Sequence, residues 1–154
     1  MQIIIAAVGR MKRGPAAEMI ADYLKRTRWD VSVKELADAP SGMAAEARRA
    51  REAKEILALV DKETRLIAMD SRGQSLDSVA ISAAIGKFRT QGAKRLVIAI
   101  GGQDGLDERV LAQAGLKLAF GTATWPHQLL RLMLAEQVYR AYTIEAGHPY
   151  HLGH

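Results

Sequence analysis

The sequence contains no cysteine, which excludes a disulfide framework and a thiolate metal site. It has no apolar run near the length that crosses a bilayer, and its opening residues lack the basic segment of a signal peptide. Catalytic signatures are also missing: there is no G-x-S-x-G, no H-E-x-x-H and no paired-carboxylate pattern. We therefore expect a cytoplasmic protein with no membrane segment, whose chemistry depends on positioning more than on a side-chain nucleophile.

Histidine occurs only in the last part of the chain, where it could suggest a metal site. The four are His127, His148, His151 and His154. Neither a cysteine nor an aspartate-rich motif accompanies them, so we expect no metal.

What is present indicates one globular, basic domain spanning residues 1–154. Hydrophobic residues make up 49% of the 154, which argues against disorder. The net charge is +5, and residues 10–54 alone carry eleven Lys and Arg against seven acids. Excess positive charge is a mild indication of a polyanionic partner such as nucleic acid.

Apolar and helical patterns alternate along the chain. Strands are predicted at residues 2–8, 31–36 (near a sheet edge), 66–69, 95–100 and 116–120, with a turn at 70–73. Helices are predicted from 15 to about 28, from a cap at Ser41 to about 61, from 75 to near Gly92, at 107–114, and from 126 onwards. This alternation predicts an α/β fold with a mostly parallel sheet of five to six strands and helices on both faces.

Two glycine-containing loops each follow a predicted strand and precede a helix, where α/β proteins place ligands. The first is Gly101-Gly102-x-x-Gly105, which is neither a dinucleotide fingerprint nor a P-loop. A tight strand-to-helix turn explains it equally well. The second, residues 120–126, places small residues beside a tryptophan, which leaves room for a flat ligand held by backbone amides. Its alternative is a helix cap at Thr124 with a packed Trp125.

Three blocks of sequence together resemble the large-subunit ribosomal RNA methyltransferase H family, the pseudouridine N3-methyltransferases of the SPOUT class. They are IAAVGRMK (5–12), VIAIGG (97–102) with Gly105, and TWPHQLLR (124–131), the last continuing through AEQVYRA (135–141) to HPYH (148–151). The resemblance implies a C-terminal trefoil knot, a bound S-adenosyl-L-methionine, an obligate homodimer whose sites borrow from the partner, and methylation of N3 of a pseudouridine in 23S ribosomal RNA.

The resemblance also implies site residues. The cofactor should be bound by Met69, Gly101, Phe120, Gly121, Thr122, Ala123, Thr124 and Trp125. Contact with RNA or cofactor, or catalysis, is expected of Arg140, Tyr150 and His151. Among these three, histidine is the ordinary proton acceptor. The alternatives are a surface ion pair for Arg140 and dimer packing for Tyr150.

Two departures from the family pattern concern the site and the tail. Gln103 stands where the family often has proline, and the ending Leu152-Gly153-His154 lacks an expected arginine. Two other functions stay open: a knotted methyltransferase acting on another RNA such as transfer RNA, and a non-catalytic ribosome-binding α/β module.

Overall fold

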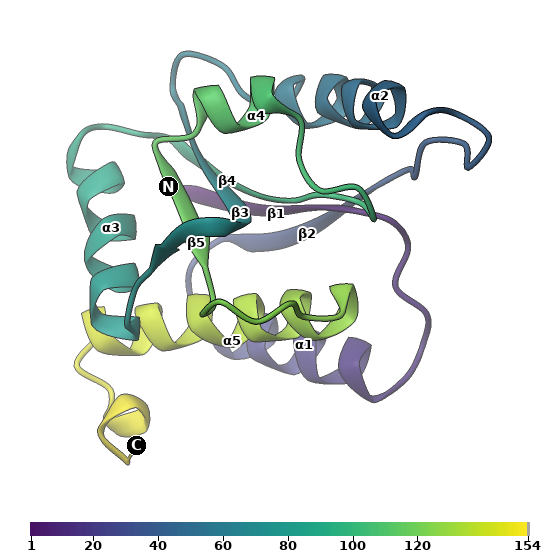
Figure 1. Ribbon diagram of the computed structural model, residues 1–154. Coiled ribbons are helices and arrows are strands. Elements are labelled where there is room, and N and C mark those ends of the chain that lie inside the picture. Colours follow the sequence, from purple (N-terminus) through teal and green to yellow (C-terminus); the bar gives the residue numbers. More distant parts are fainter. Residues whose placement is uncertain (154) are drawn as a thin grey trace.

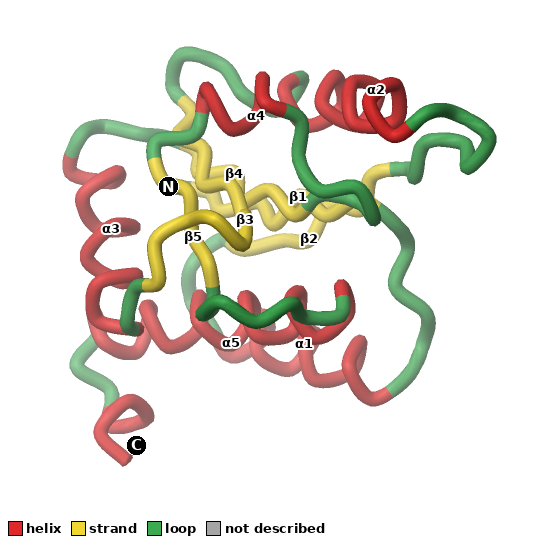
Figure 2. The backbone as a smooth tube through the Cα atoms, viewed as in Figure 1, coloured by secondary structure: helices red, strands yellow, loops and turns green. Residues whose placement is uncertain are grey.

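The computed structural model describes residues 1–153, so His154 lies outside it. The strands are β1 (Gln2–Val8), β2 (Val31–Leu36), β3 (Thr64–Ser75), β4 (Arg95–Ile100) and β5 (Leu116–Ala119). The helices are α1 (Pro15–Arg26), α2 (Ala45–Leu57), α3 (Ser78–Thr90), α4 (Glu108–Gln113) and α5 (His127–Glu145), followed by the 3-10 helix η1 (Pro149–Gly153). The alternation predicted from the sequence is confirmed (Figures 1 and 2).

All five strands pair in parallel, in the order β2-β1-β4-β3-β5. The predicted fold class is therefore confirmed, and β2 lies at an edge as expected. Because parallel strands share their direction, the carboxyl ends of β1, β4, β3 and β5 meet at one border of the sheet. The loops that follow these strands are consequently neighbours, although they are far apart in sequence.

Helices cover both faces of the sheet, with α2 and α4 on one side and α1, α3 and α5 on the other (Figure 1). Successive side chains of a strand point to opposite faces. In β4, Ile98 and Ile100 pack with residues of α3 and α5, whereas Val97 packs with residues of α2 and α4. This explains the continuous apolar sequence of the strand, since both of its faces are buried.

Several predicted boundaries were wrong. The second helix has no side-chain cap at Ser41; α2 begins at Ala45, and Ser41 instead accepts a hydrogen bond at its carbonyl oxygen from Arg48 Nη1 (3.0 Å). Likewise, α3 is capped by Asp77, which accepts from the Ala80 amide (2.8 Å), two residues after the predicted start.

The segment predicted as a turn at residues 70–73 belongs to β3. Its composition suggests a turn, but the pairing of β3 with β5 resumes at Gln74 after a register shift. Gly73 lies so close to β5 that a Cβ atom there would be 2.7 Å from the carbonyl carbon of Lys117. Both Met69 and Gln74 pair with Leu118, so residues 70–73 form an irregular insertion within β3, in which the Arg72 amide donates to Asp70 Oδ1 (2.8 Å). The trefoil knot concerns how the chain is threaded, which strand order and register do not describe, so it stays a prediction.

Candidate functional site

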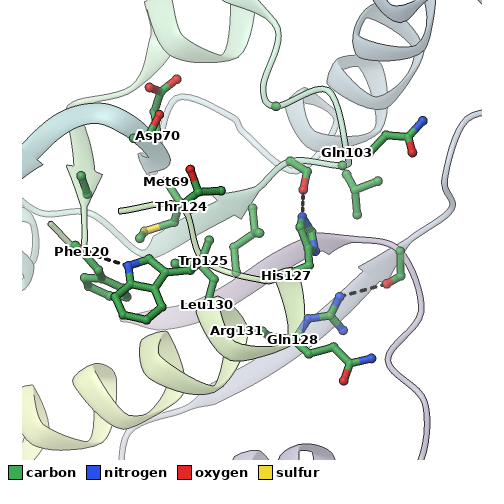
Figure 3. Close-up of a pocket in the computed structure, with 18 of the residues that line it drawn as sticks. Met69, Asp70, Gln103, Phe120, Thr124, Trp125, His127, Gln128, Leu130 and Arg131 are labelled. Carbon is green, nitrogen blue, oxygen red and sulfur yellow. Dashed lines mark hydrogen bonds between the residues drawn. The ribbon is translucent and has the colours of Figure 1, made fainter. Parts of the chain in front are cut away.

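A pocket of about 710 Å³ lies at the carboxyl border of the sheet (Figure 3). Its walls come from the loops after β1, β2, β4 and β5, from the middle of β3 and from the first turns of α5. Of the eight residues expected to bind the cofactor, seven line it: Met69, Gly101, Phe120, Gly121, Ala123, Thr124 and Trp125. Thr122 belongs to the same loop but is not among the lining residues. The two loops singled out in the sequence thus form one cavity.

The β5–α5 loop forms the outer wall, and residues 121–126 are all exposed. Gly121 has a φ of +78°, a backbone conformation that side-chain-bearing residues rarely adopt. The indole Nε1 of Trp125 donates a hydrogen bond to the carbonyl oxygen of Phe120 (2.8 Å), which ties the two ends of the loop together (Figure 3). Thr124 does not cap α5, whose N-cap is Pro126 without a side-chain bond.

The β4–α4 loop forms the opposite wall, and its glycines are required by the loop itself. A Cβ on Gly101 would lie 2.7 Å from the carbonyl carbon of Gly105 and 2.8 Å from its oxygen. Gly105 has a φ of +79°. His127, in the first turn of α5, donates from Nε2 to the carbonyl oxygen of Gly101 and so joins the two walls (Figure 3). The loop is therefore both a tight turn and a ligand wall.

The floor of the pocket is apolar and its rim is charged. Met69, Ile100 and Leu118 are buried lining residues. At the rim, Asp70 accepts two hydrogen bonds from the guanidinium of Arg72 (3.0 and 2.9 Å), and this holds the pKa of Asp70 below its usual value. Asp70 is therefore an ionised, ion-paired carboxylate at the edge of an apolar cavity.

Arg131 is a pocket residue that the sequence did not reveal. It is 4% exposed. Its Nη1 donates to Glu35 Oε2 of β2 (2.8 Å) and its Nη2 to the carbonyl oxygen of Gly9 (3.1 Å). Glu35 Oε2 also accepts the Met11 amide (2.5 Å). The sequence did offer a signal, because Arg131 lies on the same face of the last helix as Leu134. An arginine on a buried face requires hydrogen-bond acceptors.

The residues expected to act on the substrate form a separate cluster at the end of α5. Arg140 donates to Glu136 Oε1 from Nε (2.9 Å) and Nη2 (2.6 Å), and the Tyr150 hydroxyl donates to the same oxygen (3.1 Å). The ion pair proposed as the alternative for Arg140 therefore exists. None of Arg140, Tyr150 and His151 lines the pocket. Nδ1 of His151 is buried and has no hydrogen-bond partner within residues 1–153.

Burial, together with hydrogen bonding and nearby charge, raises the pKa of Tyr150 far above its usual value of 10.0. Its phenol therefore stays protonated at neutral pH and serves as a hydrogen-bond donor. Within residues 1–153 there is no cluster of three or more His, Asp or Glu side chains placed to hold a metal ion, and no helix long and apolar enough to cross a membrane.

A glycine-walled, apolar-floored pocket at the carboxyl ends of a parallel sheet is typical of α/β proteins with a site for an organic small molecule. The family described as predicted SPOUT methyltransferase matches residues 1–151, and the chain belongs to this family. The resemblance inferred from the sequence is thus confirmed.

Similar proteins extend over nearly the whole chain. The ribosomal RNA large subunit methyltransferase H of Rhodospirillum centenum is 46% identical over 151 residues, which cover 98% of this chain and 99% of that protein. The proteins of the same name from Bradyrhizobium diazoefficiens and Brucella anthropi are each 43% identical over 159 residues, covering 98% of this chain and 99% of each relative.

Proposed function

We propose that this protein is a single-domain, cytoplasmic methyltransferase that uses S-adenosyl-L-methionine to methylate N3 of a pseudouridine in 23S ribosomal RNA. The observation that carries the proposal is the pocket: seven residues expected to bind the methyl donor, from three separate segments, line one cavity. The names of the relatives, ribosomal RNA large subunit methyltransferase H, support the RNA substrate.

The pocket residues fit the methyl donor. Its adenine is a flat ring that the backbone of the two glycine-containing walls can hold over the floor of Met69 and Leu118. At the rim, Asp70 offers carboxylate oxygens as acceptors for polar groups of the donor, beside its ion pair with Arg72. When bound, the donor supplies an already activated methyl group, so the chain needs no nucleophile of its own. Its contribution is to align the reactants, which can be worth roughly 7–11 kcal/mol in favourable cases.

The tail cluster supports a homodimer. Because Arg140, Tyr150 and His151 do not line the pocket of their own chain, they can contact the reacting groups only if a second copy supplies them. The outer faces of α1 and α5 carry exposed apolar side chains, with Met19 48% and Leu129 44% exposed. Burying these on a second copy favours association. In such a site Tyr150, which stays protonated, donates a hydrogen bond, and the imidazole of His151 is the candidate acceptor of the N3 proton.

Complementation between two inactive variants tests this shared site. Gly101→Val disrupts the pocket wall, and His151→Ala removes the proton acceptor while leaving donor affinity nearly intact. When the two variants are mixed in equal amounts, half of the dimers contain one copy of each. One of the two sites in such a dimer is complete, so about a quarter of the wild-type activity should return. If the mixture stays inactive although mixed dimers form, the shared site is wrong.

The substrate is tested separately by mass spectrometry of 23S ribosomal RNA from a deletion strain. Loss of N3-methylpseudouridine supports the proposal. If the modification persists, another RNA such as a transfer RNA is the substrate. Calorimetry with S-adenosyl-L-methionine that shows no heat would instead favour a non-catalytic ribosome-binding module.

A further inference from the structure

We propose that the β1–α1 loop, residues 9–14, is a phosphate-binding strap that docks the RNA backbone at the mouth of the pocket, and that Arg131 and Glu35 hold it in place. This inference rests on the proposed function, because it assumes that the pocket acts on RNA. It assigns substrate binding to a segment that lies apart from the methyl-donor loops and from the tail.

The strap carries three cations, and Arg10 among them also helps to lower the pKa of Glu35 through its charge. Arg10, Lys12 and Arg13 are all exposed. Across residues 1–153, none of them forms an ion pair. Three unpaired cations within four residues repel one another, and a bound anion relieves that repulsion. Phosphate contacts of this kind supply most of the sequence-independent affinity for nucleic acid.

The position of the strap fits this role. Arg10 and Met11 line the pocket, so the strap begins at the cavity and leads away from it toward α1. In Figure 1 the segment runs from the end of β1 along the outside of the molecule to the start of α1, next to the first turn of α5. A nucleotide whose base enters the pocket must keep its flanking phosphates outside the cavity, where Arg10 lies at the rim and Lys12 and Arg13 follow it along the chain.

The strap is held at its base by a clamp of the buried Arg131 and the partly exposed Glu35. Arg131 Nη2 donates to the carbonyl oxygen of Gly9 (3.1 Å), and Glu35 Oε2 accepts the Met11 amide (2.5 Å) and the Arg131 Nη1 bond (2.8 Å). The carboxylate of Glu35 on β2 and the guanidinium of Arg131 on α5 therefore fix Gly9 and Met11, the two residues that flank Arg10. Gly9, with a φ of +98°, supplies the bend at which the chain leaves β1. The clamp at one end and α1 at the other leave the cations between them exposed.

A salt titration with charge-removing variants tests the strap. The probe is purified ribosomes, and the measurement is their affinity for the protein between 50 and about 200 mM salt, the range over which phosphate contacts weaken binding. In the variant Lys12→Gln/Arg13→Gln, the fall of log K with log salt should be less steep by about 1.4–1.8, because each lost phosphate contact removes roughly 0.7–0.9 from the steepness. The control Lys62→Gln/Lys87→Gln removes the same charge from exposed positions away from the strap and should leave the slope unchanged.

Calorimetry separates the strap from the proposed function. The strap variant should bind S-adenosyl-L-methionine as tightly as the wild type, since neither residue lines the pocket. If wild-type protein methylates ribosomes and the strap variant keeps the wild-type salt slope, the strap proposal fails and the function stands. If the wild type neither binds the donor nor modifies RNA, the proposed function fails whatever the slope.

The clamp is tested by limited digestion with trypsin, which cuts after lysine and arginine. Glu35 lies on the edge strand with its side chain 41% exposed, so its replacement does not open the core. Glu35→Ala should speed cleavage at Lys12 and Arg13 several-fold, whereas Glu35→Gln, which keeps an acceptor for the Met11 amide, should restore part of the protection. Equal cleavage rates in all three proteins would contradict the clamp.

Discussion

Gly101→Ala adds a single methyl group where the backbone of the β4–α4 loop has no space for it. The added Cβ would lie 2.7 Å from the carbonyl carbon of Gly105, 2.8 Å from its oxygen and 3.0 Å from the amide nitrogen of Leu106. All three are backbone atoms, so no side chain can rotate away and the turn itself must open. The displaced wall is the one that His127 joins to α5.

The size of the effect follows from the cost of overpacking. Forcing an extra methyl group into a packed site costs about 1–3 kcal/mol. If this strain falls on the geometry that the bound donor requires, the affinity for S-adenosyl-L-methionine drops roughly 5- to 140-fold, since 1.4 kcal/mol corresponds to a factor of ten. Calorimetry measures the affinity, and thermal unfolding shows whether the folded state is weakened as well.

Gly86→Ala is the matched control. Gly86 lies inside α3, and a Cβ there would meet nothing within 4 Å. Alanine is favoured over glycine in a helix by about 0.5–1 kcal/mol, so this variant should unfold at a slightly higher temperature and bind the donor normally. An affinity for Gly101→Ala within a factor of two of the wild type, in a protein that remains folded, would refute the claim that this backbone forms the pocket wall.

Two further predictions concern the other loops. Trp125→Phe keeps a ring but loses the 2.8 Å hydrogen bond to Phe120, and such a bond is worth about 0.5–1.5 kcal/mol. Calorimetry should therefore show that donor affinity falls by roughly 2- to 12-fold. An unchanged affinity would mean that the loop is not ordered by this bond. The pKa of Glu35 is lowered from its usual value of 4.5, chiefly by the Met11 amide and also by Arg131, so its contribution to stability is complete above about pH 4.5 and is lost as the pH falls through the lower folded-state pKa. Acid titration of the unfolding temperature should therefore be shallower in Glu35→Gln than in the wild type, and identical curves would argue against the clamp.

The fold could be predicted well because runs of apolar residues in the sequence mark the buried strands. The residues of β1 and β4 are apolar on both faces, and their predicted bounds agree with the structure. The end of β3 was missed because Asp70 and Gly73 have the composition of a turn, while pairing with β5 resumes beyond them at Gln74 and Ser75. Local chemistry is a weak guide wherever a partner distant in sequence supplies the hydrogen bonds.

The pocket could also be predicted in part, because its loops follow buried strands. Glycine-containing loops after buried strands indicate a ligand site, and the family resemblance supplied Met69. The clamp could not be predicted, because Arg131 lies 96 residues from Glu35 and 122 from Gly9 in sequence. Only the parallel order of the strands brings these residues together.

The length of α5 supports the proposal that a second copy completes the site. The helix begins at the pocket with His127 and Arg131 and carries Arg140 near its other end. At about 1.5 Å per residue, the 13 residues from His127 to Arg140 span roughly 20 Å along a rigid axis. The tail then folds back onto Glu136 and Tyr139, so Tyr150 is fixed to the helix and cannot extend to its own pocket without losing these contacts. A second copy whose tail reaches this pocket removes that conflict, and the exposed apolar side chains on α1 and α5 offer the surface on which it would dock.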